Sequence, residues 1–304
     1  MLRIETAAGS YGGEGVAMRP RLIRGFPLLA GLLVVTACST SAASSEPASS
    51  QLAEASPTAS VAPTARATVQ ADPLIRPVID GAFDVGDGRK LYLQCWGEGS
   101  PTIVIDAGGG EIQEYREFAA TFTSRLAHQR RVCAYDRAGH GRSDPAPNKP
   151  RQLEDLTGDL HALLEAAGVE GPLVLVGNSF GGFIMAFYAN RYAEDVAGVV
   201  LLDVPAPSAT MTAEGEPELA WDHPGNVEHN DVVAGFENRL ADEQFPFDAP
   251  LLVVTASDGQ SSLEDQSFWL DWSPSSRQIE LSGGHELHVD QAVAAADAVL
   301  SMAK

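Results

Sequence analysis

Positive charge is scarce in this chain. Its 304 residues include 20 Lys and Arg against 41 Asp and Glu, which gives a formal net charge of -21 at pH 7. Binding to nucleic-acid phosphates needs a basic surface, so we expect no nucleic-acid partner. The apolar share of 44% is ordinary for a globular protein, so most of the chain can bury a core.

Long apolar runs are also lacking near the N-terminus. The uncharged run from Phe26 to Val35 is too short for a membrane-spanning helix, which needs roughly 20 residues. Three arginines precede this run and small residues follow it, which is typical of a secretory signal. We therefore predict a signal segment over residues 1–37. Because the residues before Met18 fit no signal pattern, we hypothesise that translation starts there.

Cysteine is rare, and the first of the three follows the signal segment directly. The ending Val35-Thr36-Ala37-Cys38 resembles a bacterial lipobox. This resemblance implies lipid attachment to Cys38, and therefore an exported protein of the bacterial cell envelope that is anchored to the membrane. A simple signal peptide and a secreted protein are the alternative. Residues 38–75 are mainly Ser, Ala, Thr and Pro, which predicts a flexible tether before a domain over residues 76–304.

Within that domain, short apolar runs alternate with helical patterns. Unbroken apolar strands between helices indicate an α/β protein with a parallel sheet covered on both faces. Acidic sequence with Pro and Gly over residues 205–248 indicates a cap insertion at one end of the sheet. The expected strands are Phe83–Val85, Lys90–Trp96, Thr102–Asp106, Arg131–Tyr135, Pro172–Val176, Val196–Asp203, Pro250–Ala256 and Arg277–Leu281. The expected helices are Glu111–Gln129, Leu153–Ala167, Phe180–Tyr192 and Asp290–Met302.

The sequence Gly177-Asn178-Ser179-Phe180-Gly181 matches the nucleophile elbow Gly-x-Ser-x-Gly. A Ser in a tight strand-to-helix turn needs neighbours without a Cβ, and the turn lifts its hydroxyl clear of the sheet. The context fits, because a predicted strand precedes Ser179 and a predicted helix follows it. Ser179 is therefore the candidate nucleophile.

A Ser nucleophile needs a base and a carboxylate that orients the base. His285 follows the last predicted strand, and His288 lies three residues further on. Asp258 comes shortly after one predicted strand and Asp203 ends the strand before it, so either carboxylate would lie at the carboxyl edge of the sheet. The residues alone leave the base and the acid open.

An oxyanion hole needs two backbone N–H groups that point at one position. The Phe180 N–H, directly after the nucleophile, is the first candidate. We expect the second from Gly108-Gly109-Gly110, where the missing side chains let a substrate oxygen approach the backbone.

Four segments together resemble the α/β-hydrolase superfamily, in its serine hydrolase branch. This resemblance implies a mostly parallel eight-stranded sheet with helices on both faces and a short cap. It also implies that His285 is the base and that Gly109 supplies the second oxyanion N–H. The segments are Asp106-Ala107-Gly108-Gly109-Gly110, Tyr135-Asp136-Arg137-Ala138-Gly139-His140-Gly141-Arg142-Ser143, Gly177–Gly182 and Gly284-His285-Glu286-Leu287-His288-Val289-Asp290-Gln291.

The acid departs from this family pattern. The usual Gly-x-x-Asp after the seventh strand is here Ala256-Ser257-Asp258, without the Gly and with the Asp one place early. We favour Asp258 as the acid and keep Asp203 as the alternative. The family topology also makes the second and fourth strands neighbours, which leads us to predict a disulfide between Cys95 and Cys133.

The chain is thus expected to be a carboxylesterase-like serine hydrolase. It would cleave an ester or related small-molecule acyl compound through an acyl-enzyme on Ser179, without a metal or organic cofactor. An acyltransferase or peptidase could use the same triad. A binding or signalling protein that merely keeps the fold is the non-enzymatic alternative.

Overall fold

The computed structural model describes residues 76–207, 220–231 and 246–304. The predicted signal segment, the lipidation site at Cys38 and the predicted tether lie outside the described residues. So do residues 208–219 and 232–245 of the predicted cap insertion. Within the described ranges, every helix is too short or too polar to cross a membrane.

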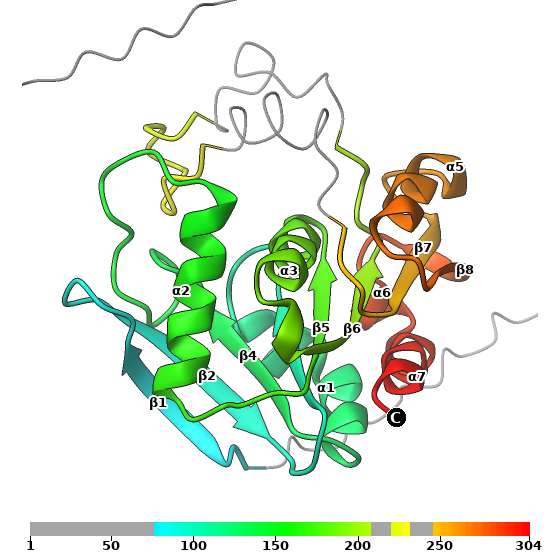
Figure 1. Cartoon of the computed structure of the whole chain (residues 1–304), viewed down its shortest axis with the longest axis horizontal. Coiled ribbons are helices and arrows are strands. Elements are labelled where there is room, and N and C mark those ends of the chain that lie inside the picture. Colours follow the sequence, from blue (N-terminus) through cyan, green and yellow to red (C-terminus); the bar gives the residue numbers. More distant parts are fainter. Residues whose placement is uncertain (1–75, 208–219, 232–245) are drawn as a thin grey trace, which may run out of the picture. The chain divides into compact units, whose positions relative to one another are not determined.

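An eight-stranded sheet forms the centre of the domain, in the order β1-β2-β4-β3-β5-β6-β7-β8 (Figure 1). Strand β2 runs antiparallel to both of its neighbours, and the remaining pairs are parallel. This is the mostly parallel sheet that was predicted. The strands are β1 Ile79–Asp84, β2 Lys90–Trp96, β3 Thr102–Asp106, β4 Val132–Asp136, β5 Leu173–Asn178, β6 Val196–Leu202, β7 Leu251–Asp258 and β8 Ser276–Gly284.

Helices cover both faces of the sheet because its central strands are apolar on both sides. In β3, Val104 belongs to a core cluster that contains buried residues of α2 and α3, whereas Ile103 and Ile105 belong to a second cluster with α1 and α7. Alternate side chains of one strand thus pack on opposite faces. The helices are α1 Ala120–Ala127, α2 Leu153–Ala166, α3 Phe180–Arg191, α5 Leu263–Gln266, α6 Leu287–Asp290 and α7 Ala292–Met302, with the short turns η1 Glu114–Phe118, η2 Ala193–Asp195 and η5 Ser267–Trp272.

The helix that was expected over Glu111–Gln129 is two elements. The Ala119 N–H donates to the carbonyl of Glu114, five residues earlier, so η1 is a π-type turn and α1 begins after it. The helix that was expected over Asp290–Met302 is likewise divided, into α6 and α7. Hydrophobic periodicity does not resolve such local changes of hydrogen-bond pattern.

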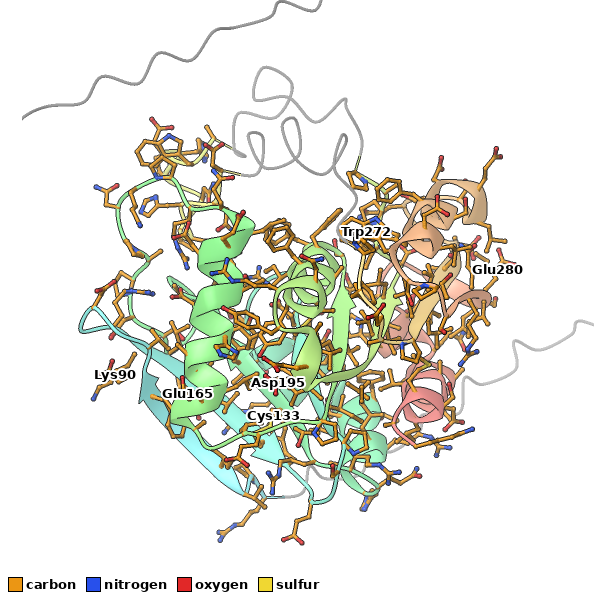
Figure 2. All side chains as sticks on the ribbon, in the orientation of Figure 1. Lys90, Cys133, Glu165, Asp195, Trp272 and Glu280 are labelled. Atoms are coloured by element: carbon orange, nitrogen blue, oxygen red, sulfur yellow. A yellow bond between two sulfur atoms is a disulfide. The ribbon has the colours of Figure 1, made fainter. Side chains whose placement is uncertain are left out.

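The predicted cysteine pair, Cys95 and Cys133, is joined by a disulfide. The two residues are direct register partners in the antiparallel pair β2–β4, and both are fully buried. In Figure 2 the exposed side chains of Lys90 and Glu280 lie at opposite edges of the molecule, and Cys133 lies between them. The disulfide thus crosslinks two strands inside the core.

Candidate active site

Ser179 lies in the tight turn between β5 and α3, and its backbone is in the left-handed region with φ 49°. A non-Gly residue in this region costs about 1–3 kcal/mol, which the surrounding structure must offset. The turn also leaves no room for side chains beside it. A Cβ on Gly177 would lie 2.4 Å from the Gly182 Cα, and one on Gly181 would lie 2.4 Å from the Asp106 carbonyl oxygen. The two elbow glycines are therefore sterically required.

His285 follows β8 and has a carboxylate partner. Its Nδ1 lies 2.7 Å from Oδ2 of Asp203, which directly follows β6 and is completely buried. The Asp203 carboxylate also accepts hydrogen bonds from two backbone N–H groups and from the Gln266 side chain. These donors are Ala256 N at 3.1 Å, Gln260 N at 3.3 Å and Gln266 Nε2 at 2.7 Å. A fixed, ionised acceptor thus orients the imidazole.

The pKa values of this pair shift in opposite directions. Burial alone would raise the pKa of Asp203, but the hydrogen bonds from His285, Gln266 and the backbone lower it below its ordinary value. The hydrogen bond with Asp203 raises the pKa of His285, against the opposing effect of burial. The carboxylate is therefore held ionised, and the imidazolium form of His285 is stabilised.

The prediction of Asp258 as the partner of His285 is wrong in this structure, which places Asp203 there. Strand β7 continues through Asp258, which pairs with Gly284 of β8 and has an exposed side chain. The chain then turns directly over the alternative acid, because a Cβ on Gly259 would lie 2.5 Å from Asp203 Oδ2. The missing Gly-x-x-Asp pattern was the sequence signal that the acid lies elsewhere.

Asn178 connects the elements of the site, a role that was not predicted from the sequence. Its buried amide donates to the carbonyls of Leu202, at 3.0 Å, and of His285, at 3.3 Å. The residue before Ser179 therefore binds both the end of β6, next to Asp203, and the loop that contains His285. Asn178 thus brings the Ser179 turn, His285 and Asp203 to one place at the carboxyl edge of the sheet.

The predicted oxyanion donors lie beside Ser179, the candidate nucleophile. Phe180 is the first residue of α3, so its N–H has no partner within the helix. The loop after β3 passes directly against the turn, since a Cβ on Gly108 would lie 3.0 Å from the Cβ of Ser179. Gly109, the next residue, is exposed. Both N–H groups thus belong to backbone that borders Ser179.

A buried charge cluster, which was not predicted from the sequence, lies behind this loop. Arg137 contacts the carboxylates of Asp106 and Glu228, and all three side chains are nearly inaccessible to solvent. Complete burial raises the pKa of Asp106 to about 6, although Arg137 and the hydroxyl of Tyr135 act in the opposite direction. Burial would also raise the pKa of Glu228, but Arg137 and His140 hold it well below its ordinary value.

His288, the second candidate base, has a different environment. It is fully buried, and its Nε2 lies 2.6 Å from Glu114 Oε1 and 3.1 Å from Glu286 Oε2. Its ring packs against Tyr115, with the ring centroids 5.1 Å apart. Within the described residues, the ligand atoms of His288, Glu114 and Glu286 lie within 4.8 Å of one another, which would allow a metal ion. Because His288 Nε2 and Glu114 Oε1 are already in direct hydrogen-bond contact, we interpret the group as hydrogen-bonded packing.

Comparison with known proteins identifies the fold. A family model described as "alpha/beta hydrolase fold" matches residues 101–246. The solved structure of an enol-lactonase from Burkholderia xenovorans is 21% identical, covers 72% of this chain and 98% of its own, and has a TM-score of 0.57. The chain therefore has the α/β-hydrolase fold.

Curated relatives are distant and varied. The bifunctional esterase/perhydrolase DCH of Acinetobacter calcoaceticus is 28% identical over 218 residues, which are 70% of this chain and 73% of that protein. A proline iminopeptidase of Pestalotiopsis fici is 29% identical over 119 residues, 39% of this chain. The alignment covers only 41% of that iminopeptidase. A separate alignment with a probable transporter of Hormonema carpetanum covers only 18% of that protein.

Proposed function

We propose that this protein is a serine hydrolase that cleaves an ester or a related acyl compound through an acyl-enzyme on Ser179. The observation that carries the proposal is the hydrogen bond of 2.7 Å between His285 and the buried Asp203, held beside the Ser179 turn by Asn178. A nucleophile, an oriented base and two backbone donors are the parts that acyl transfer needs.

The orientation of His285 determines its role. Its Nδ1 is occupied by Asp203, so Nε2 is the nitrogen left to accept the proton of the Ser179 hydroxyl. The serine oxygen forms a bond to the acyl carbon, and the carbonyl electrons move to an oxyanion that the N–H groups of Phe180 and Gly109 stabilise. The intermediate collapses, the alkoxide leaves, and it takes the proton from His285.

Water completes the cycle by the same chemistry in reverse order. His285 removes a proton from a water molecule, whose oxygen attacks the acyl-enzyme and forms a second oxyanion in the same hole. Collapse breaks the bond to Ser179, and the serine oxygen recovers the proton from His285. The products are an acid and an alcohol, and no step needs a metal or an organic cofactor.

The substrate class rests on the site together with the relatives. DCH is named an esterase and perhydrolase, and the Burkholderia protein is named an enol-lactonase. Both names describe attack on an oxygen ester. A small-molecule ester or lactone is therefore our proposed substrate, and acyl transfer to another alcohol or peptide cleavage would use the same acyl-enzyme.

A fluorophosphonate probe tests the nucleophile directly. We expect stoichiometric labelling of the peptide that contains Ser179 and no labelling of the Ser179→Ala variant. The same variant should lose at least about 10⁴-fold in kcat on nitrophenyl esters, as expected for loss of a triad nucleophile. A series of acyl chain lengths would then define the acyl pocket. A wild-type protein that is neither labelled nor hydrolytic would be a binding protein on this fold.

Export and lipid anchoring at Cys38 are part of the proposal. The buried disulfide between Cys95 and Cys133 supports export, because disulfides persist in oxidising compartments. We expect the full chain, expressed in a bacterium that processes lipoproteins, to fractionate with membranes and to incorporate a labelled fatty acid. A Cys38→Ala variant should lose the label. Equal labelling of both proteins would contradict the lipidation site.

A further inference from the structure

One described stretch of the predicted cap insertion, residues 220–231, is attached to the body of the domain near Gly108-Gly109-Gly110, which we call the oxyanion loop. The Arg151 N–H donates to the carbonyl of His229 at 2.9 Å, and the Asp231 N–H donates to the carbonyl of Arg151 at 2.8 Å. Glu228, directly before His229, points inward and is only 6% exposed. A buried carboxylate in a surface insertion needs a partner inside the protein.

That partner is Arg137, which follows β4. Its Nε and Nη2 donate to the two carboxylate oxygens of Glu228, both at 2.9 Å, in a bidentate pair. A further bond to the same carboxylate involves His140 Nε2, also at 2.9 Å. Bidentate geometry fixes the plane of the guanidinium group as well as its position.

The remaining donors of Arg137 hold the oxyanion loop. Its Nη1 donates to Asp106 and to the carbonyl of Ala107, the latter at 2.6 Å, and its Nη2 donates to the carbonyl of Gly108 at 3.2 Å. All five N–H groups of the guanidinium are thus used. The guanidinium carbon also lies 5.4 Å from the ring centroid of Phe180, the residue whose N–H is the other proposed oxyanion donor.

The contact with Gly108 matters because of the planarity of the peptide bond. The carbonyl of Gly108 and the N–H of Gly109 belong to one trans peptide unit, so they point in opposite directions within one plane. In a run of three glycines no side chain restrains the rotation of this plane. The hydrogen bond from Arg137 therefore restrains where the Gly109 N–H points, together with the backbone hydrogen bonds of Gly110 to Ala107 and Arg137.

We propose that Glu228 of the cap is a positioning residue for the oxyanion hole. By fixing the plane of Arg137, it fixes the peptide plane that presents the Gly109 N–H to the substrate. This inference rests on the proposed hydrolase function. It makes a segment of the cap a part of transition-state stabilisation, in addition to any role in covering the substrate.

The test compares Glu228→Gln with a matched control from the same segment, Asn226→Ala. Gln keeps the size of Glu228, but it directs an amide NH₂ at the donors of Arg137 or His140. Asn226 donates to the carbonyls of Ala220 and Asn230, at 3.1 and 2.8 Å, and no hydrogen bond links it to Arg137. Removing an oxyanion donor costs about 10²–10³-fold in kcat, so misaligning one should cost about 10- to 100-fold.

We expect Glu228→Gln to lower kcat on a nitrophenyl ester by that factor, with KM changed by less than about threefold, as for an interaction made in the transition state. Its affinity for a trifluoromethyl ketone, which forms a serine-bound oxyanion, should fall by the same factor as kcat/KM. Asn226→Ala should keep the wild-type kcat. Thermal unfolding monitored by circular dichroism identifies the folded fraction of each variant.

A shorter carboxylate provides the second variant. Glu228→Asp retains the charge but cannot reach both nitrogens in the same way, so its kcat should lie between those of Glu228→Gln and the wild type. If Glu228→Gln does not fold, the kcat of Glu228→Asp alone tests the positioning role of Glu228. A folded Glu228 variant with wild-type kcat and inhibitor affinity would overturn the inference while leaving the hydrolase proposal intact. A wild-type protein without fluorophosphonate labelling would instead overturn the proposed function itself.

Discussion

Replacing Asp203 by Asn is the sharpest test of the proposal that Asp203, and not Asp258, is the acid of the triad. In the structure, Asp203 Oδ1 accepts from Ala256 N and Gln266 Nε2, while Oδ2 accepts from His285 Nδ1 and Gln260 N. An Asn has one oxygen and one NH₂ group, so in either orientation its NH₂ faces two donors. The orientation that keeps the bonds of Oδ1 places the NH₂ against His285.

The consequence for catalysis is a change of tautomer. His285 can then meet the NH₂ group only as an acceptor at Nδ1, which places its proton on Nε2, where the Ser179 proton must go. A wrong-tautomer histidine costs up to about 10⁴-fold in kcat. The NH₂ also leaves the Gln260 N–H without an acceptor, which should lower the free energy of unfolding by about 1–3 kcal/mol.

The assay is steady-state hydrolysis of a nitrophenyl ester by Asp203→Asn and Asp258→Asn, with urea unfolding of both. We expect kcat to fall by about three to four orders of magnitude in the first variant. The second should behave like the wild type in both measurements, because the Asp258 side chain is exposed and, within the described residues, accepts a hydrogen bond only from the Ser257 hydroxyl. A large loss in Asp258→Asn with a normal Asp203→Asn would refute this reading of the site.

Three further predictions concern the histidines and the disulfide. His285→Ala should be about as damaging to kcat as Ser179→Ala, whereas His288→Ala should mainly lower the melting temperature, because it empties a buried site; the reverse ranking in ester assays would move the base. As the pH is raised, kcat/KM should increase with a midpoint above 6.5, because Asp203 raises the pKa of His285 and only neutral imidazole can accept the proton. A midpoint below 6.5 would contradict this. Replacing Cys95 and Cys133 together by Ala should lower the free energy of unfolding by about 3–4 kcal/mol for a loop of 38 residues, measured by urea unfolding; an unchanged midpoint would show that the crosslink does not stabilise the fold.

Sequence reasoning identifies those parts of the site that depend on local backbone geometry. The elbow around Ser179 is a steric pattern within five residues, so its glycines reveal it without any tertiary information. The position after the last strand makes His285 and His288 candidates for the base, and the resemblance to the hydrolase family favours His285. The buried central strands are likewise found, since β3 and β5 are fully buried and read as unbroken apolar runs, whereas β1 begins four residues before the predicted Phe83–Val85.

The parts that sequence reasoning misses depend on contacts between distant segments. The bonds of Arg137 with Asp106 and Glu228 join residues 31 and 91 positions apart. Asn178 meets the carbonyl of His285 across 107 positions. In each case the residue type is compatible with an ordinary surface role, and only the three-dimensional register of the loops shows that it is buried and paired. The choice of acid fails for the same reason.

The position of the acid follows from the geometry of parallel strands rather than from the chain order. Strands β5, β6, β7 and β8 are successive neighbours, about 4.8 Å apart, so the ends of β6 and β7 both lie between the elbow after β5 and His285 after β8. The end of β7 is used for pairing with β8 as far as Asp258 and Gly284, which points that carboxylate away. Asp203 instead contacts His285 Nδ1. Its backbone is left-handed, with φ 47°, which Asp tolerates better than most residues. A family pattern that fixes the acid by its strand number therefore fails here, whereas the physical requirement, a buried carboxylate within hydrogen-bond distance of His285 Nδ1, identifies Asp203.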